Sequence, residues 1–190
     1  FQPLSIKNQV VVRAPFHTEY PGFPIQIVIE PNMAFGTGNH ETTSMMMETM
    51  LEMNFNGKAV LDMGCGTGIL AILASKLGAR EITALDIDPW SFDAVSENLI
   101  INNALNIRPG LGDAVKIGDS KYDVLLVNIQ KNVILNDMPK YATALNSGGT
   151  ILFSGFFESD LPDIQQAATT YGLKFISSKV KNNWIVSAFQ

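Results

Sequence analysis

The chain has 190 residues, and its 13 Lys and Arg against 18 Asp and Glu give a formal net charge of −5. Hydrophobic residues make up 46% of the sequence, which excludes a disordered chain, and the single cysteine excludes a disulfide framework and agrees with a reducing, cytoplasmic compartment. The acidic balance argues against nucleic-acid binding through bulk positive charge, and no apolar run reaches the ~18 residues needed to span a membrane.

The first part of the chain, residues 1–55, predicts an extension that precedes the main sheet. Residues 10–13 and 25–30 have the apolar character of strands, a loop follows over 31–40, and a methionine-rich helix is predicted over 42–53. No linker separates this extension from residues 56–190. We therefore expect one structural domain.

Short apolar runs alternate with helical patterns from residue 56 onward. The runs at 59–63, 82–86, 124–128 and 150–153 predict strands, and another strand is expected at about 107–109. Helical patterns follow three of them, at 69–77, 89–102 and 133–145, with a bend or restart expected near Pro139. Strands that alternate with helices predict a parallel sheet covered on both faces.

The C-terminal part departs from this alternation. Residues 173–180 and 184–189 have strand character and are separated only by Lys181, Asn182 and Asn183, which predicts a tight hairpin. One of these two strands must then be antiparallel. The predicted fold class is α/β, a Rossmann-like, doubly wound and mostly parallel sheet with an antiparallel C-terminal hairpin.

A glycine-rich turn follows the first strand of this sheet. Gly64, Gly66 and Gly68 stand where the strand ends and a helix opens, a place where glycines let the backbone turn sharply and let a ligand approach it. Asp86 ends the second strand, about 20 residues further on, from where a carboxylate can hold the ribose hydroxyls of a nucleoside.

Asp62 indicates which nucleoside cofactor this turn binds. Residues 66–71 also fit a loose dinucleotide pattern, but a carboxylate at position 62 would repel a pyrophosphate. S-adenosylmethionine has no phosphate, and its ammonium and sulfonium are favoured by a nearby carboxylate. The motif from Asp62 to Gly68 therefore favours S-adenosylmethionine.

Two later residues support a nucleoside site. Asp113 follows the third strand, where a side chain can meet the adenine amine, and Asn128 closes the fourth strand with a polar side chain. Ligands of open α/β sheets bind at the carboxyl ends of the strands. No second Cys or His stands at metal-ligand spacing from Cys65, so no metal site is predicted.

With these residues identified, the sequence resembles the class I methyltransferases that use S-adenosylmethionine. It resembles more closely the methyltransferases of bacterial ribosomal large-subunit protein eleven, the PrmA family, from about residue 10 to the end. The most specific part is the run Met33-Ala34-Phe35-Gly36-Thr37-Gly38-Asn39-His40-Glu41-Thr42-Thr43. Further matches are residues 61–72, Asp86-Ile87-Asp88-Pro89, Val127-Asn128-Ile129, Ser154-Gly155 and Trp184.

The resemblance implies roles for individual residues. The family's cofactor contacts fall on Thr43, Gly64, Asp86 and Asn128, and Phe35 and Thr37 lie in the loop that covers the methionine end of the cofactor. Asn128 matches the Asn that faces the amine, so it is the predicted catalytic residue. Family members trimethylate the amino terminus and lysine side chains of their ribosomal protein. The implied activity is therefore protein-lysine N-methylation, with that ribosomal protein as the partner.

The chain departs from the family at two points. Gln130 and Lys131 follow Asn128-Ile129 where the family has Leu-Ala. Family members also carry a separate N-terminal domain that grips the ribosomal protein, and nothing in this sequence corresponds to it. We therefore expect the chain to be the catalytic part of a longer protein.

Three other functions remain open on sequence alone. The first is a methyltransferase acting on RNA or a small molecule. The second is a nicotinamide-dependent oxidoreductase, which Asp62 disfavours. The third is a cofactor-binding module that is inactive without a recognition domain.

Overall fold

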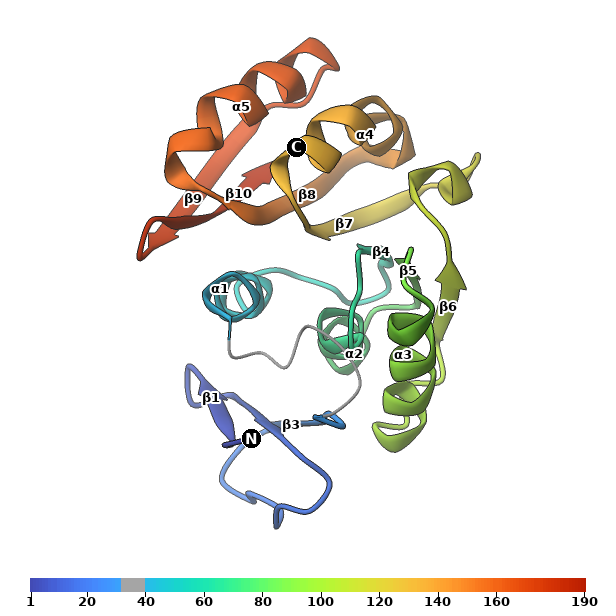
Figure 1. Cartoon of the computed structure of the whole chain (residues 1–190), viewed down its shortest axis with the longest axis vertical. Helices are drawn as coiled ribbons and strands as arrows, with labels where there is room; N and C mark the ends of the chain where they lie inside the picture. The colour runs from blue at the N-terminus through green and yellow to red at the C-terminus, as the bar shows by residue number, and fades with distance from the viewer. Residues whose placement is uncertain (32–39) are drawn as a thin grey trace.

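A seven-stranded sheet runs through the centre of the molecule (Figure 1). The computed structural model describes residues 1–31 and 40–190. In spatial order the strands are β6 (Ile107–Leu111), β5 (Glu81–Asp86), β4 (Ala59–Met63), β7 (Tyr122–Asn128), β8 (Leu145–Phe157), β10 (Trp184–Phe189) and β9 (Phe175–Lys181). The first five are parallel, and β10 pairs antiparallel with both β8 and β9. The predicted parallel sheet with a C-terminal hairpin is confirmed.

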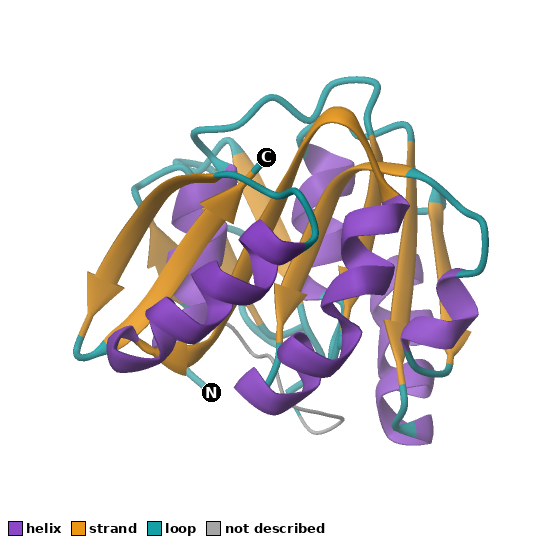
Figure 2. Cartoon of the chain, turned by 90° about the horizontal axis from the view of Figure 1, so that it is seen from above, coloured by secondary structure: helices purple, strands orange, loops and turns teal. Residues whose placement is uncertain are grey.

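Helices cover both faces of this sheet (Figures 1 and 2). One face carries α1 (Glu41–Met50), α2 (Ile69–Lys76) and α3 (Pro89–Ile101), and the other carries α4 (Lys131–Ala144) and α5 (Leu161–Thr170). Alternate residues of a central strand enter opposite hydrophobic clusters: Val124 and Leu126 of β7 lie in one, and Leu125 and Val127 in the other. Burial on both faces explains why the central strands have continuously apolar sequences. No helix of the described residues is long and apolar enough to span a membrane.

Two features on this side of the fold differ from the predictions. Of the bend or restart expected near Pro139, the restart does not occur, because α4 continues through the proline. Ile134, Met138 and Tyr141 of α4 are fully buried against the sheet, and this packing on both sides of the proline outweighs its poor helix propensity. No helix was predicted after the run at 150–153, yet α5 follows β8, after the short 3₁₀ turn η2 (Glu158–Asp160).

The N-terminal extension forms its own small sheet of β1 (Leu4–Ile6), β2 (Val10–Arg13) and β3 (Ile25–Val28), of which β1 was not predicted. Ile27 and Ile29 lie in the same hydrophobic cluster as α2. The amide side chains of Asn98 in α3 and of Asn102, which caps the C-terminus of α3, accept hydrogen bonds from the backbone N–H groups of Glu30 and Val28, at 3.1 and 2.8 Å. The small sheet is thereby fastened to the helical layer that flanks the glycine turn.

Candidate functional site

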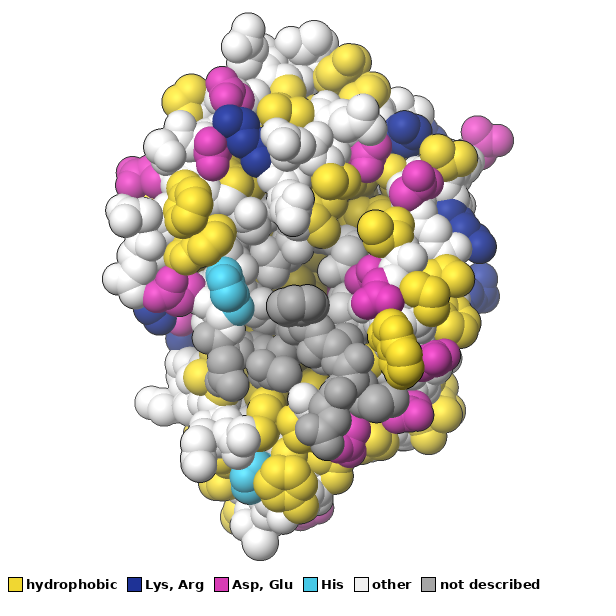
Figure 3. All heavy atoms as spheres, viewed as in Figure 1, with side chains coloured by type: hydrophobic (Ala, Val, Ile, Leu, Met, Phe, Trp, Pro, Cys, Tyr) yellow, Lys and Arg dark blue, Asp and Glu magenta, His cyan; other side chains and the backbone are white. Residues whose placement is uncertain are grey.

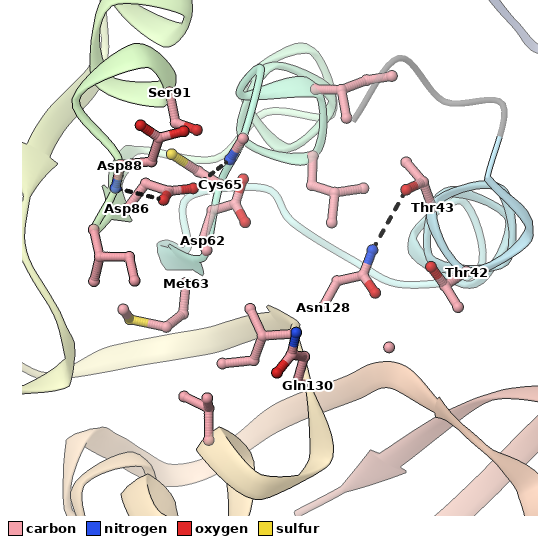
Figure 4. Close-up of a pocket in the computed structure, with 18 of the residues that line it drawn as sticks. Thr42, Thr43, Asp62, Met63, Cys65, Asp86, Asp88, Ser91, Asn128 and Gln130 are labelled. Carbon is pink, nitrogen blue, oxygen red and sulfur yellow. Dashed lines mark hydrogen bonds between the residues drawn. The ribbon is translucent and has the colours of Figure 1, made fainter. Parts of the chain in front are cut away.

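A cavity of about 730 Å³ opens at the carboxyl ends of the central strands (Figure 4). The chain runs from β4 outward to β5 and β6, then returns to β7 on the other side of β4. The loops after β4 and β7 therefore diverge and leave a crevice, the usual ligand position in open α/β sheets. In the space-filling view, acidic side chains border one side of the hollow and a histidine borders the other (Figure 3).

The glycine turn after β4 forms the floor of this cavity. Gly64, Gly66 and Gly68 all have positive φ angles, of 72°, 54° and 81°. A Cβ atom on Gly64 would lie 2.2 Å from the Cγ2 atom of Ile129, so no larger residue fits there. Gly64 and Gly66 line the cavity as predicted, whereas Gly68 does not. It caps the start of α2 and packs against Val95, where a Cβ would lie 2.4 Å from Cγ2, so this close packing requires glycine.

Asp86 is fixed by the backbone around it. Its Oδ2 accepts a hydrogen bond from Gly66 N–H at 2.9 Å, and its Oδ1 accepts one from Asp88 N–H at 3.0 Å (Figure 4). A carboxylate offers about four lone-pair positions. Asp86 therefore joins the glycine turn to the end of β5 and keeps acceptor capacity for a ligand.

Asp62 is buried beneath the turn and also borders the cavity. Its Oδ2 accepts a hydrogen bond from Ala71 N–H at 3.1 Å. Burial raises its pKa to about 7, and the negative charge of Asp86 adds to this shift. The negative charge of Asp62 has no cationic partner within the described part of the chain. A cationic ligand group placed beside it would favour its ionised form.

The side of the cavity around the glycine turn is acidic. Asp113 lines it while also capping the short 3₁₀ helix η1 (Ala114–Ile117) through a 2.9 Å hydrogen bond from Val115 N–H. Asp88 and Asp137 line the cavity too, and no Lys or Arg is among its described lining residues. This charge disfavours a phosphate-bearing ligand. Burial and the carboxylates of Asp62 and Asp86 raise the pKa of the Cys65 thiol well above its usual value, which makes Cys65 a poor nucleophile.

The opposite side of the cavity is neutral and aromatic. Asn128 closes β7 and donates a hydrogen bond from Nδ2 to Oγ1 of Thr43 in α1, at 3.4 Å (Figure 4). Trp184, at the start of β10, and His40 also line the cavity, with their ring centroids 4.9 Å apart at 72°. The carboxylates of Asp62 and Asp86 and the Asn128–Thr43 pair thus face one cavity from different sides.

Most of the predicted site residues come together here. Those lining the cavity are Thr43, Asp62, Gly64, Gly66, Asp86, Asp113 and Asn128. Phe35 and Thr37 lie outside the described residues. Ile129 and Asp137 also line the cavity, although the sequence patterns did not predict them as site residues. Ile129 could have been found because it directly follows Asn128, but a single acidic residue within α4 gives no local signal.

Comparison with known proteins agrees with this geometry. The family model described as "Ribosomal protein L11 methyltransferase (PrmA)" matches residues 1–190. A ribosomal protein L11 methyltransferase from Porphyromonas gingivalis is 46% identical over the whole chain, and one from Phocaeicola vulgatus is 44% identical. The chain spans about two thirds of the length of these relatives, 66% and 68% respectively.

Solved structures show the same fold. A ribosomal protein L11 methylase from Lactobacillus delbrueckii subsp. bulgaricus superposes with a TM-score of 0.90 and 28% identity, covering 100% of this chain and 98% of that one. Trm5b from Pyrococcus abyssi, at 24% identity and a TM-score of 0.67, covers 83% of this chain and 50% of that one. The second likeness concerns the fold alone.

Proposed function

The chain belongs to the ribosomal protein L11 methyltransferase family, and we propose that it transfers methyl groups to lysine side chains and the N-terminal amine of that ribosomal protein. The observation that carries the proposal is a single cavity with two chemically different sides. The acidic side, around Asp62 and Asp86, suits a cationic nucleoside. The side of Asn128, Thr43 and Trp184 suits an amine at the end of an apolar chain.

S-adenosylmethionine is the methyl donor of this family, and the described residues fit it. When bound, it supplies an electrophilic methyl group on a positively charged sulfonium. Asp62 provides the fit: a buried carboxylate at the cavity wall that lacks a cationic partner among the described residues. The absence of Lys and Arg from the described lining argues against a nicotinamide dinucleotide, whose pyrophosphate needs positive charge.

Each carboxylate is assigned to a different part of S-adenosylmethionine. We assign Asp86 to the ribose hydroxyls, since the backbone N–H groups of Gly66 and Asp88 already fix its orientation. Asp113 is placed to accept from the adenine amine, and Asp62 with Gly64 would hold the methionine end. Asn128 and Thr43 lie between these groups and the aromatic side, where donor and acceptor would meet.

Asn128 is the proposed catalytic residue for the acceptor amine. Its Nδ2 is engaged by Thr43, which leaves Oδ1 to accept a hydrogen from the amine. That contact would hold the nitrogen with its lone pair toward the donor. A lysine amine has a pKa of about 10.4 in water and must lose a proton before it can attack. The neutral, aromatic surroundings of Asn128 favour the uncharged amine, and the proton would pass to water.

The domain boundaries belong to the same proposal. We assign the methyl-transfer core to residues 56–190 and treat residues 1–55 as an extension. The Thr43–Asn128 hydrogen bond supports treating both parts as one structural domain, because it joins the extension to the core at the proposed acceptor site.

A binding and transfer experiment tests the proposal. Calorimetric titration should show binding of S-adenosylhomocysteine and no binding of NAD. Incubation with S-adenosylmethionine and purified ribosomal protein L11 should add mass in multiples of one methyl group, mapped by peptide sequencing to lysines or the N-terminus. Methylation of RNA in place of the protein, or NAD binding, would overturn it. Transfer only by a longer form of the protein would show that recognition requires a further part.

A further inference from the structure

A second hollow, of about 440 Å³, lies beside the acceptor side of the main cavity. It is lined by Phe157, Glu158, Ser159 and Asn183. These residues come from the end of β8, the turn η2 and the β9–β10 turn. The backbones of η2 and the β9–β10 turn are held together there, because Glu158 N–H donates a hydrogen bond to the carbonyl of Asn183 at 2.7 Å.

One aromatic pair separates the two hollows. Phe157 and Trp184 are opposite each other in the β8–β10 pairing, and their rings are in contact, with centroids 4.3 Å apart and a tilt of 30°. Phe157 lines the second hollow, while Trp184 lines the main cavity. A polypeptide whose amine reaches Asn128 past Trp184 would therefore place a neighbouring residue over Phe157 and into the second hollow.

The charge of this hollow comes from Glu158. Its side chain is exposed and forms no ion pair with any described residue. The nearby acids differ: Asp160 and Asp163 both pair with Lys131, at 2.9 and 2.6 Å. Glu158 is thus an uncompensated carboxylate in a concave place that adjoins the amine site.

We propose that this hollow binds a basic side chain that flanks the methylated amine in the substrate protein, with Glu158 as its anionic partner. The inference rests on the proposed function, since it needs the substrate amine at the Asn128 end of the cavity. Glu158 acts here as a specificity residue that contacts the substrate chain, and Phe157 packs against the aliphatic stem of the basic residue.

Competition between short peptides tests the proposal. Each peptide carries one lysine, flanked on both sides by Arg, by Gln or by Glu, and its inhibition constant is measured against methylation of ribosomal protein L11. The wild-type chain should bind the Arg-flanked peptide about two- to fivefold more tightly than the Gln-flanked one, as for an exposed ion pair. Glu158→Gln should abolish this preference, and Glu158→Lys should reverse it toward the Glu-flanked peptide.

Glu97→Lys is the matched control, because Glu97 is exposed on α3, at the opposite edge of the sheet, and its substitution changes the net charge equally. It should keep the wild-type preference. Equal inhibition by all three peptides, no inhibition by any, or an unchanged preference in Glu158→Lys would overturn the inference. A wild-type chain, alone or in its longer form, that does not methylate L11 would instead overturn the proposed function.

Discussion

Asn128 and Thr43 are joined by a 3.4 Å hydrogen bond although 85 positions separate them in the sequence. Asn128 ends a strand buried on both faces, and Thr43 lies on α1, which packs against β7, β8 and β10. The bond fixes the amide of Asn128, so that its nitrogen faces α1 and its oxygen is left for a ligand. This one contact orients the proposed acceptor side of the cavity.

Removing the amide should slow methyl transfer. We expect Asn128→Ala to lower the single-turnover rate about 10- to 100-fold with saturating S-adenosylmethionine, the loss typical of a hydrogen bond to a reacting or charged group. Thr43→Ser keeps the hydroxyl and should stay near the wild-type rate. A normal rate for Asn128→Ala, measured by quenched-flow mass spectrometry, would remove Asn128 from the mechanism.

Asp86 should control donor affinity. Asp86→Ala removes the proposed ribose acceptor and the partner of Gly66 N–H, so binding of S-adenosylhomocysteine should weaken about 10- to 100-fold by calorimetry. Glu81→Gln is the control, because Glu81 is exposed at the other end of the same strand. Unfolding curves of both variants establish that the loss is one of binding. Similar affinities for the two variants would contradict the assignment.

Asp62 should make stability depend on pH in an unusual direction. Its pKa in the folded state is about 7, above the ordinary value of 3.8, so the folded protein holds the extra proton between these values. Its contribution to stability is therefore fully present below about pH 4 and is lost as pH rises through 7. Asp62→Asn should gain in melting temperature relative to wild type as pH rises from 4 to 7. A constant difference across this range would refute the shift.

The pKa of Asp123 is shifted in the opposite direction from that of Asp62. The hydrogen bond from Ala59 N–H lowers its pKa, so its contribution is present at neutral pH and is lost on acidification. Asp123→Asn should therefore lower the melting temperature at pH 7, with a difference that narrows toward acid pH. The two variants should therefore give slopes of opposite sign, Asp62→Asn between pH 4 and 7 and Asp123→Asn below about pH 4.

Gly64 should be sensitive to any side chain, and Gly57 provides a matched reference. Both have a φ angle of 72°, but a Cβ on Gly57 meets nothing within 4 Å, whereas one on Gly64 lies 2.2 Å from Ile129 Cγ2. Gly57→Ala should cost about 1–2 kcal/mol from backbone strain alone. Gly64→Ala should cost more and also weaken S-adenosylhomocysteine binding, because Ile129 must move beside Asn128. If Gly64→Ala and Gly57→Ala lowered the free energy of unfolding equally, the glycine turn would accommodate the added methyl group without strain.

The sequence predicted the central strands well because their requirements are local. The run at 59–63 coincides with β4, and its apolar character follows from burial on both faces. At Pro139 the helix does not restart, because packing of the flanking turns outweighs the local preference of proline against helix. The sequence patterns also missed β1, a strand of three residues that is too short to show a pattern.

For the site, the sequence alone predicted which residues would line the proposed donor side. Glycines at a strand end, a buried acid before them and another acid after the next strand have few other physical uses, and Gly64, Gly66, Asp62 and Asp86 all line the cavity. The tertiary structure decided what lies opposite. The Asn128–Thr43 bond and the contact of Phe157 with Trp184 depend on sheet order and strand register, which arise from packing across the whole domain and leave no trace in any short segment.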